Sequence, residues 1–198
     1  MMQIDWRELE KKLKKEQKGL RFQHTLGVAY TAAALALRWD VDMDRARLAG
    51  LLHDCAKCLS DKKKLEICEE QQLEVSDFEK EHPVLLHAKV GTYLAEADYG
   101  ITDAEILSAI NWHTTGRPGM TRLEQIIFVA DYIEPNRNKA PNLQEVRGLA
   151  FQDLDRCTYR ILQDTVDYLK KNPKSMDRMT MRAFTYYYNL LYPGTQGY

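Results

Sequence analysis

Four histidines and two aspartates stand where helices of this 198-residue chain would turn their apolar faces inward. All but Asp54 are spaced three, four or seven residues from aliphatic neighbours, which places them on one helix face with those neighbours. The six are His24, His53, Asp54, His87, His113 and Asp131. Apart from the adjacent His53 and Asp54, each lies in a different segment of the chain. They therefore approach a common interior from separate helices.

Asp131 is the most informative of the six, because a carboxylate is costly to bury alone. It follows Ile127 by one helical turn and comes directly after an apolar run that ends at Ala130. Burial without a partner costs several kcal/mol, and no lysine or arginine lies on the neighbouring turn of that helix face. A bound cation is the economical explanation, so the sequence predicts that the six side chains converge on metal.

The ligand types narrow the choice of metal. Imidazole and carboxylate suit iron, manganese, cobalt, nickel and zinc. Six ligands exceed what one tetrahedral zinc ion uses, and the absence of cysteine argues against a structural zinc site. Two ions about 3.5–4 Å apart, sharing Asp54 and a hydroxide, would accommodate the whole set. The spacing predicts a metal site but leaves the number of ions open.

The elements that must position these residues are helical, because no run of alternating residues indicates a strand. We expect an all-α, single-domain helical bundle. The expected helices are one around Leu9 and Leu13, one from about Leu20, one from Asp42 or Asp44 to about Cys55, Ser60–Glu74, Pro83 to about Tyr99, one from Thr102 that stops before Gly116, Thr121 to near Pro135, one around Leu143–Ala150, one from about Leu154 to Leu169, and a last one through Phe184 and Leu190.

Composition excludes several classes of function. The chain has 28 basic and 29 acidic side chains, and this balance gives no case for nucleic-acid binding. No apolar stretch approaches the ~20 residues that span a bilayer, so we expect no membrane partner. The first residues are charged, unlike a secretory signal. Four cysteines without such a signal predict reduced thiols and a cytoplasmic protein.

Four ordered blocks carry a resemblance to a known family. They are HDCAK at 53–57, HPVLLH at 82–87, NWHTTG at 111–116 and ADYIEPNR at 130–137. With His24, they resemble the HD-domain superfamily of metal-dependent phosphohydrolases, and more closely its YqeK family, from about residue 18 to about 190. Ala88 departs from this family, which often has glycine there. The resemblance implies an HD-type phosphohydrolase domain over residues 19–195, with residues 1–18 as a peripheral N-terminal helix.

The resemblance also implies an activity and a cofactor. It implies a symmetrical diadenosine tetraphosphate hydrolase that releases two ADP and uses a dinuclear centre containing iron; manganese, cobalt or nickel would also suit the ligands. One ion would be held by His24, His53, Asp54 and Asp131, and the other by His87, His113 and the second oxygen of Asp54. A metal-bridging hydroxide would be the nucleophile, since bound metal lowers the pKa of water from about 15.7 to about 7.

Phosphate-binding side chains are expected beside the ions, because a polyphosphate carries more negative charge than two ions cancel. Lys57 and Arg137 are the best candidates, and Arg117 and Thr114 are weaker ones. Each has a structural alternative, a helix-end cap for Lys57 and a solvated loop charge for Arg137. His82 lies five residues before His87, off the ligand face; it either donates a proton to the leaving ADP or starts the helix. The catalytic candidates are Asp54, Lys57 and His82.

Two other functions fit the same residues. The site could hydrolyse another purine nucleotide, such as a guanosine polyphosphate or a deoxynucleotide. The chain could instead be a nucleotide- or RNA-binding regulator with structural metals, although a structural site has no need of open coordination. The sequence leaves open whether the chain forms a homodimer.

Overall fold

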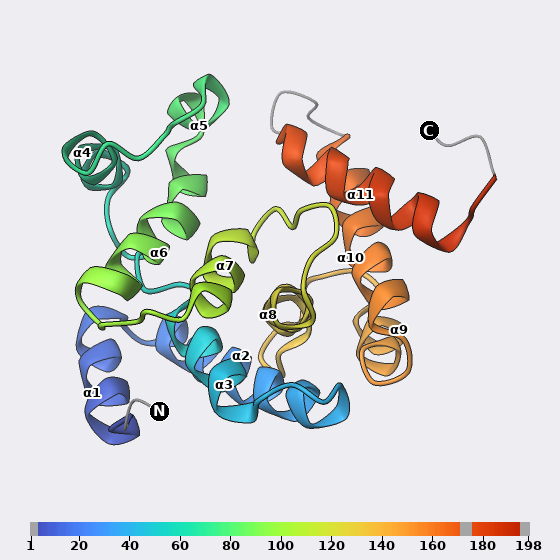
Figure 1. The fold of residues 1–198 in the computed structure, drawn as a ribbon, viewed down its shortest axis with the longest axis horizontal. Helices are drawn as coiled ribbons and strands as arrows, with labels where there is room; N and C mark the ends of the chain where they lie inside the picture. The colour runs from blue at the N-terminus through green and yellow to red at the C-terminus, as the bar shows by residue number, and fades with distance from the viewer. Residues whose placement is uncertain (1–3, 171–175, 195–198) are drawn as a thin grey trace.

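All regular secondary structure in the computed structural model is helical within the residues it describes, 4–170 and 176–194. The elements are α1 (Trp6–Glu16), α2 (Leu20–Arg38), α3 (Met43–Leu52), α4 (Asp61–Glu70), α5 (Asp77–Glu81), the 3-10 helix η1 (Pro83–Leu85), α6 (Leu86–Ala97), α7 (Ala104–Trp112), α8 (Arg122–Ile133), α9 (Leu143–Leu149), α10 (Leu154–Leu169) and α11 (Arg178–Leu191) (Figure 1). The predicted all-α fold is confirmed.

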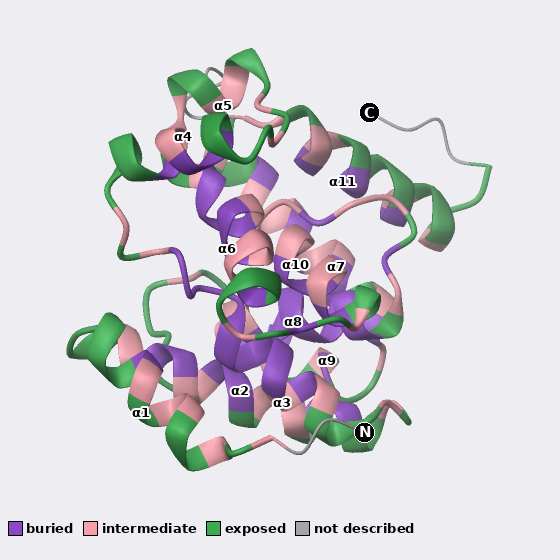
Figure 2. Cartoon of the chain, turned by 60° about the vertical axis from the view of Figure 1, so that its left-hand side comes forward, coloured by how far each residue is buried: buried purple, intermediate pink, exposed green. Residues whose placement is uncertain are grey.

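Helix α8 forms the middle of the bundle, with α2, α3, α7, α9 and α10 around it (Figure 1). Most of its side chains are buried, including the fully buried Ile126, Ile127 and Ala130. Its first turn is fixed by a capping box, in which Thr121 and Glu124 bond each other's backbone. Figure 2 shows buried residues gathered on α2, α3, α6 and α8, and exposed residues on the outer faces of α1, α5 and α11.

Helices α2 and α3 approach each other closely through Gly50. A Cβ atom added to Gly50 would lie 2.8 Å from the Cα atom of Ala29, so a side chain there would force the helices apart. The side chain of Asp42 accepts the backbone N–H of Arg45 and caps the start of α3. This crossing brings the end of α3 beside the first half of α2.

The region before α6 differs from the sequence expectation. A short helix, α5, follows Ser76, whose capping box with Glu79 fixes its first turn. Pro83 then starts a 3-10 turn rather than an α-helix, and α6 begins only at Leu86. His82 adopts an extended-like backbone (φ −129°, ψ 62°) because a following proline disfavours the helical conformation. The expected single helix from Pro83 is therefore wrong at its start.

Helix α1 packs on the main bundle through Leu13, which is fully buried. Gln17, directly after this helix, is also fully buried. Its amide donates to the backbone carbonyl of Asp54 (3.2 Å) and accepts the hydroxyl of Thr25 (2.7 Å). The end of the N-terminal segment thus supports the backbone of a predicted site residue. Among the described residues, no helix has the length and apolar character needed to span a bilayer.

Candidate metal centre

The structure brings the six predicted ligands into one cluster, in which five side chains are buried and Asp131 is partly exposed. They come from α2 (His24), the C-terminal end of α3 and the turn after it (His53 and Asp54), α6 (His87), the C-terminal end of α7 (His113) and α8 (Asp131). Two overlapping sets have ligand atoms within 4.8 Å of one another: His24, His53 and Asp131, and His53, Asp54 and His113. Asp54 lies between the two halves of the cluster.

The two carboxylate oxygens of Asp54 face different histidines. Oδ2 lies 3.8 Å from Nε2 of His24 and 3.5 Å from Nε2 of His53. Oδ1 lies 3.3 Å from Nε2 of His87 and 3.6 Å from Nε2 of His113. A carboxylate placed in this way can serve a different cation with each oxygen.

Backbone hydrogen bonds fix the orientation of three imidazoles. Nδ1 of His53 donates to the carbonyl of Gly50 (2.7 Å), Nδ1 of His87 to that of Val84 (2.6 Å), and Nδ1 of His113 to that of Ile110 (2.6 Å). Each acceptor lies three residues before its histidine. Because a carbonyl only accepts, Nδ1 carries the proton and the lone pair of Nε2 faces the cluster, the arrangement typical of metal-binding histidines.

The fourth imidazole is held by Glu134, which the sequence analysis did not identify. Nδ1 of His24 lies 3.1 Å from Oε1 of Glu134, whose side chain is almost fully buried. Oε2 of Glu134 accepts the backbone N–H (2.7 Å) and the side-chain amide (3.0 Å) of Asn136. Glu134 follows Asp131 by three residues in the fourth sequence block, and this one-turn spacing could have identified it.

Unmatched polar atoms show that these residues fit a metal ion. Nε2 of His53 and Oδ1 of Asp54 are buried and have no hydrogen-bond partner among the described residues. Nε2 of His87 and Nε2 of His113 lie 3.1 Å apart, although each presents a lone pair. Burial lowers the pKa of His53 to about 4 and that of His87 to about 3, so both rings are neutral at pH 7. Neutral imidazoles and a buried carboxylate are the donor set that a divalent transition metal requires.

Two arginines contact the carboxylates from the solvent side. Arg21 Nη1 lies 2.6 Å from Oδ2 of Asp54, and Arg137 Nη2 lies 2.8 Å from Oδ1 of Asp131. Burial raises the pKa of Asp131, but a hydrogen bond with His24 and the charge of Arg137 outweigh burial and hold this pKa below its usual value. Arg137 reaches Asp131 from the loop beyond α8, where helix periodicity cannot place it. Arg21 was not among the predicted site residues, although it lies one turn before His24.

Lys57 and Thr114 lie at the other end of the cluster. Lys57 Nζ is 3.0 Å from Nε2 of His87 and 3.9 Å from Oδ1 of Asp54. Burial lowers the pKa of Lys57. The hydroxyl of Thr114 lies 3.1 Å from Nε2 of both His87 and His113. The structure therefore brings Lys57, Thr114 and Arg137 to the predicted ligands.

Among the described contacts, neither Arg117 nor His82 touches one of the six predicted ligands. The guanidinium of Arg117 makes a two-pronged bond to Glu124 (Nε–Oε2 and Nη2–Oε2, both 3.0 Å), within the capping box of α8. Nδ1 of His82 donates to the carbonyl of Phe78 (3.0 Å), and its ring stacks on the Phe78 ring at a centroid distance of 4.4 Å. The described contacts of Arg117 and His82 are therefore made with Glu124 and Phe78 and not with the six predicted ligands.

Comparison with known proteins places this cluster in a family. The sequence model of the HD domain matches residues 21–136, which include all six predicted ligands. A symmetrical bis(5'-nucleosyl)-tetraphosphatase of Bacillus subtilis is 42% identical over 151 residues, which are 76% of this chain and 80% of that protein. A protein of the same name from Staphylococcus aureus is 38% identical over 169 residues, covering 84% and 86% of the two chains.

A crystal structure supports the same placement. A "predicted HD superfamily hydrolase involved in NAD metabolism" from Clostridium acetobutylicum superimposes with a TM-score of 0.90. It is 36% identical in sequence, and the match covers 94% of this chain and 98% of that one. The chain therefore belongs to the HD-domain superfamily and, within it, to the YqeK-type branch that the symmetrical tetraphosphatases represent.

Proposed function

We propose that this chain hydrolyses diadenosine tetraphosphate symmetrically into two ADP, at a dinuclear centre that contains iron. The observation that carries the proposal is the position of Asp54, with His24 and His53 near one carboxylate oxygen and His87 and His113 near the other. The names of the relatives in Bacillus subtilis and Staphylococcus aureus supply the substrate class.

The proposed ligands divide into two groups about Asp54. His24, His53, Asp131 and Oδ2 of Asp54 would hold one ion, and His87, His113 and Oδ1 of Asp54 would hold the other. When bound, such ions lower the pKa of water to make a nucleophile at neutral pH and neutralise charge on the phosphoryl oxygens. The nitrogen and oxygen donors favour iron, manganese, cobalt or nickel over a structural zinc.

The cationic side chains of the centre would bind and orient the polyphosphate. Lys57 and Thr114 lie beside His87, and Arg21 and Arg137 lie beside the two aspartates at the opposite end. The side chains of Arg21 and Arg137 are 35% and 44% exposed, so substrate entering from solvent can reach them. A chain of phosphates lying across the centre would meet positive charge at both ends, and arginine can bind a phosphate through two nitrogens.

His82 remains a candidate proton donor to the leaving ADP. Its Nδ1 donates to the carbonyl of Phe78, so Nε2 is the atom that would carry the proton for the leaving group.

We also propose that the protein acts on the cytoplasmic nucleotide pool, because all four of its cysteines are free thiols and reducing compartments preserve thiols.

The proposal is tested by product analysis. The protein is purified anaerobically with Fe²⁺, its metal content is measured, and diadenosine tetraphosphate digests are separated by chromatography. We expect two iron ions per chain and ADP as the sole nucleotide product. AMP together with ATP would contradict symmetrical cleavage. If a guanosine polyphosphate or a deoxynucleotide were hydrolysed faster than diadenosine tetraphosphate, that nucleotide would be the preferred substrate. Nucleotide binding without hydrolysis, whichever metal is supplied, would indicate a regulator.

A further inference from the structure

We propose that a pocket beside the metal centre binds one purine nucleoside of the substrate, with the base stacked on Trp112; this inference rests on the proposed function. The pocket has a volume of about 800 Å³ and lies between α5, the end of α7 and the start of α11. This volume is within the range of ~300–1,000 Å³ found for small-molecule sites. Nothing in the proposed chemistry of the metal ligands requires such a space.

The pocket adjoins the metal centre through Thr114. This residue lines the pocket, and its hydroxyl is 3.1 Å from Nε2 of both His87 and His113. Trp112 lines the same pocket and directly precedes His113 in the chain. A group bound against Trp112 is therefore next to the part of the centre where the phosphates would bind.

The charge of the described lining suits a nucleoside rather than its phosphates. Four carboxylates line the pocket, from Asp77, Glu79, Glu81 and Asp177, against the two cations Lys89 and Arg178. Lys89 is paired with Glu79 (2.9 Å), and Asp77 is paired with Lys80 outside the lining (2.9 Å), which leaves Glu81 and Asp177 against Arg178. A polyphosphate would be repelled by this surplus of negative charge, whereas an uncharged base can use carboxylates as acceptors for its amino group. The phosphates would instead bind the cations of the metal centre.

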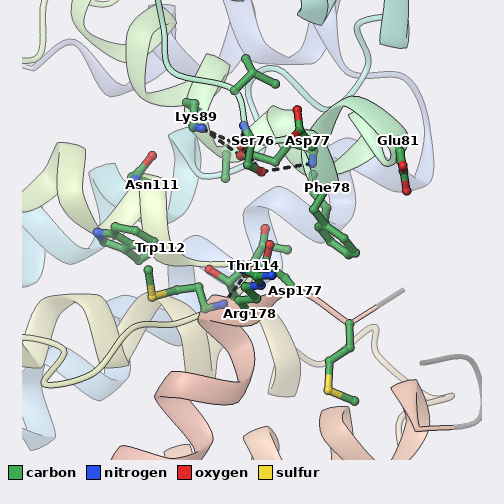
Figure 3. Close-up of a pocket in the computed structure, with 17 residues that line it drawn as sticks. Ser76, Asp77, Phe78, Glu81, Lys89, Asn111, Trp112, Thr114, Asp177 and Arg178 are labelled. Atoms are coloured by element: carbon green, nitrogen blue, oxygen red, sulfur yellow. Dashed lines mark hydrogen bonds and ion pairs between the residues drawn. The ribbon is translucent and has the colours of Figure 1, made fainter. Parts of the chain in front are cut away.

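Two aromatic rings face this space. Figure 3 shows Trp112 and Phe78 on opposite sides of the pocket, with Asn111 next to Trp112 and with Thr114 and Arg178 between the two rings. Phe78 already stacks on His82, so Trp112 is the ring that we assign to the base. Stacking of a base on an aromatic side chain is worth about 1–3 kcal/mol. The amide of Asn111 adds a donor and an acceptor at the edge of the same site.

Substitution of Trp112 separates nucleoside binding from phosphate chemistry. We expect Trp112→Ala to lower kcat/KM for diadenosine tetraphosphate by about 10- to 100-fold, mainly through KM. Hydrolysis of tripolyphosphate, which has the same type of bond and no nucleoside, should change less than twofold, and metal content should stay normal. Trp112→Phe should recover most of the loss. Tyr168→Ala removes an exposed ring outside the pocket and is the matched control.

Binding measurements keep this inference separate from the proposed function. Calorimetry with ADP and with pyrophosphate needs no turnover. Trp112→Ala should weaken the binding of ADP about tenfold or more, while the binding of pyrophosphate stays constant. If wild-type protein binds ADP in this way but does not cleave diadenosine tetraphosphate, the proposed function fails and the nucleoside site stands. If Trp112→Ala binds ADP as well as wild type does, or loses ADP and pyrophosphate equally, the nucleoside site is overturned.

Discussion

At the scale of single residues, Asp54 and Lys57 are close neighbours with different expected roles. In the proposed centre, Asp54 would contribute both carboxylate oxygens, whereas Lys57 would contribute a cation at the edge. We predict that Asp54→Ala abolishes activity and removes bound metal. Lys57→Ala should lower kcat on the order of 100-fold, as loss of one electrostatic contact to a transition state does, and leave metal content near normal. Metal analysis of both variants checks this, and equal metal loss in both would contradict the role given to Lys57.

Glu134 is one of the residues that the sequence did not identify, and it contacts a predicted metal ligand. It fixes the His24 ring through Nδ1, and residues that orient a metal-binding histidine typically contribute 10- to 100-fold to affinity. We predict that Glu134→Ala weakens metal binding by about this factor, because the ring loses its acceptor. Glu134→Gln keeps an acceptor oxygen and should lose less. Metal titration measures both, and unchanged affinity in Glu134→Ala would show that packing alone orients His24.

At the scale of elements, the crossing of α2 and α3 positions two histidines at once. An added Cβ at Gly50 would meet the backbone of Ala29 at 2.8 Å, which cannot yield without moving a helix. Gly50 also supplies the carbonyl that orients His53. We predict that Gly50→Ala lowers the free energy of unfolding by about 1–3 kcal/mol and weakens metal binding.

A second helical glycine provides the control for Gly50. At Gly148, in α9, the nearest atom to an added Cβ is Nε2 of Gln152 at 3.9 Å, an ordinary contact. Gly148→Ala should therefore leave stability unchanged or raise it by up to about 1 kcal/mol through helix propensity. Urea unfolding of both variants gives the comparison. If Gly50→Ala were as stable as Gly148→Ala, the close helix crossing would not constrain the centre.

Arg117, a weaker phosphate-binding candidate in the sequence, is paired at the start of α8 in the structure. Its guanidinium is paired with the buried carboxylate of Glu124, which also accepts the backbone N–H of Thr121. Removing one member of such a pair leaves an uncompensated buried charge. We predict that Arg117→Ala costs about 2–4 kcal/mol of stability and changes kcat/KM less than Lys57→Ala does.

An exposed ion pair provides the reference for Arg117. Arg156, whose side chain is 69% exposed, pairs with Asp153 within one turn, and Arg156→Ala should cost no more than about 1 kcal/mol. Thermal unfolding and steady-state kinetics on both variants show whether Arg117 contributes to stability or to substrate binding. A large rise in KM for Arg117→Ala without loss of stability would restore the phosphate-binding role.

Helical periodicity predicted the elements of this fold better than their ends. The helices that carry His24, His87, His113 and Asp131 were expected because each shows a long apolar stripe. The short α5 was not expected, since five residues give too few turns for a stripe. Likewise, periodicity places residues on helix faces only, so it could not show that Arg137, in a loop, meets Asp131. The contact of Gln17 with Asp54 joins segments that no local pattern relates.

At the scale of the whole molecule, the candidate metal centre joins helices from distant parts of the chain, so metal binding should stabilise the entire fold. Side chains from α2, α6 and α8 and from the C-terminal ends of α3 and α7 meet in it, and an unfolded chain does not hold their ligand atoms together. A ligand at 100 times its Kd stabilises the native state by about 2.7 kcal/mol, which for a chain of this size raises Tm by roughly 5–10 °C.

We therefore predict that Mn²⁺, or Fe²⁺ under anaerobic conditions, raises Tm by this amount and that a chelator reverses the rise. His53→Ala is the control, because it removes a ligand atom belonging to both sets of metal-binding groups. The variant starts from a lower Tm, since it leaves a cavity, so the comparison is the shift on adding metal within each protein. A shift in His53→Ala as large as in wild type would mean that the stabilising ion binds elsewhere. No shift in wild type would mean that the six side chains do not form a metal site.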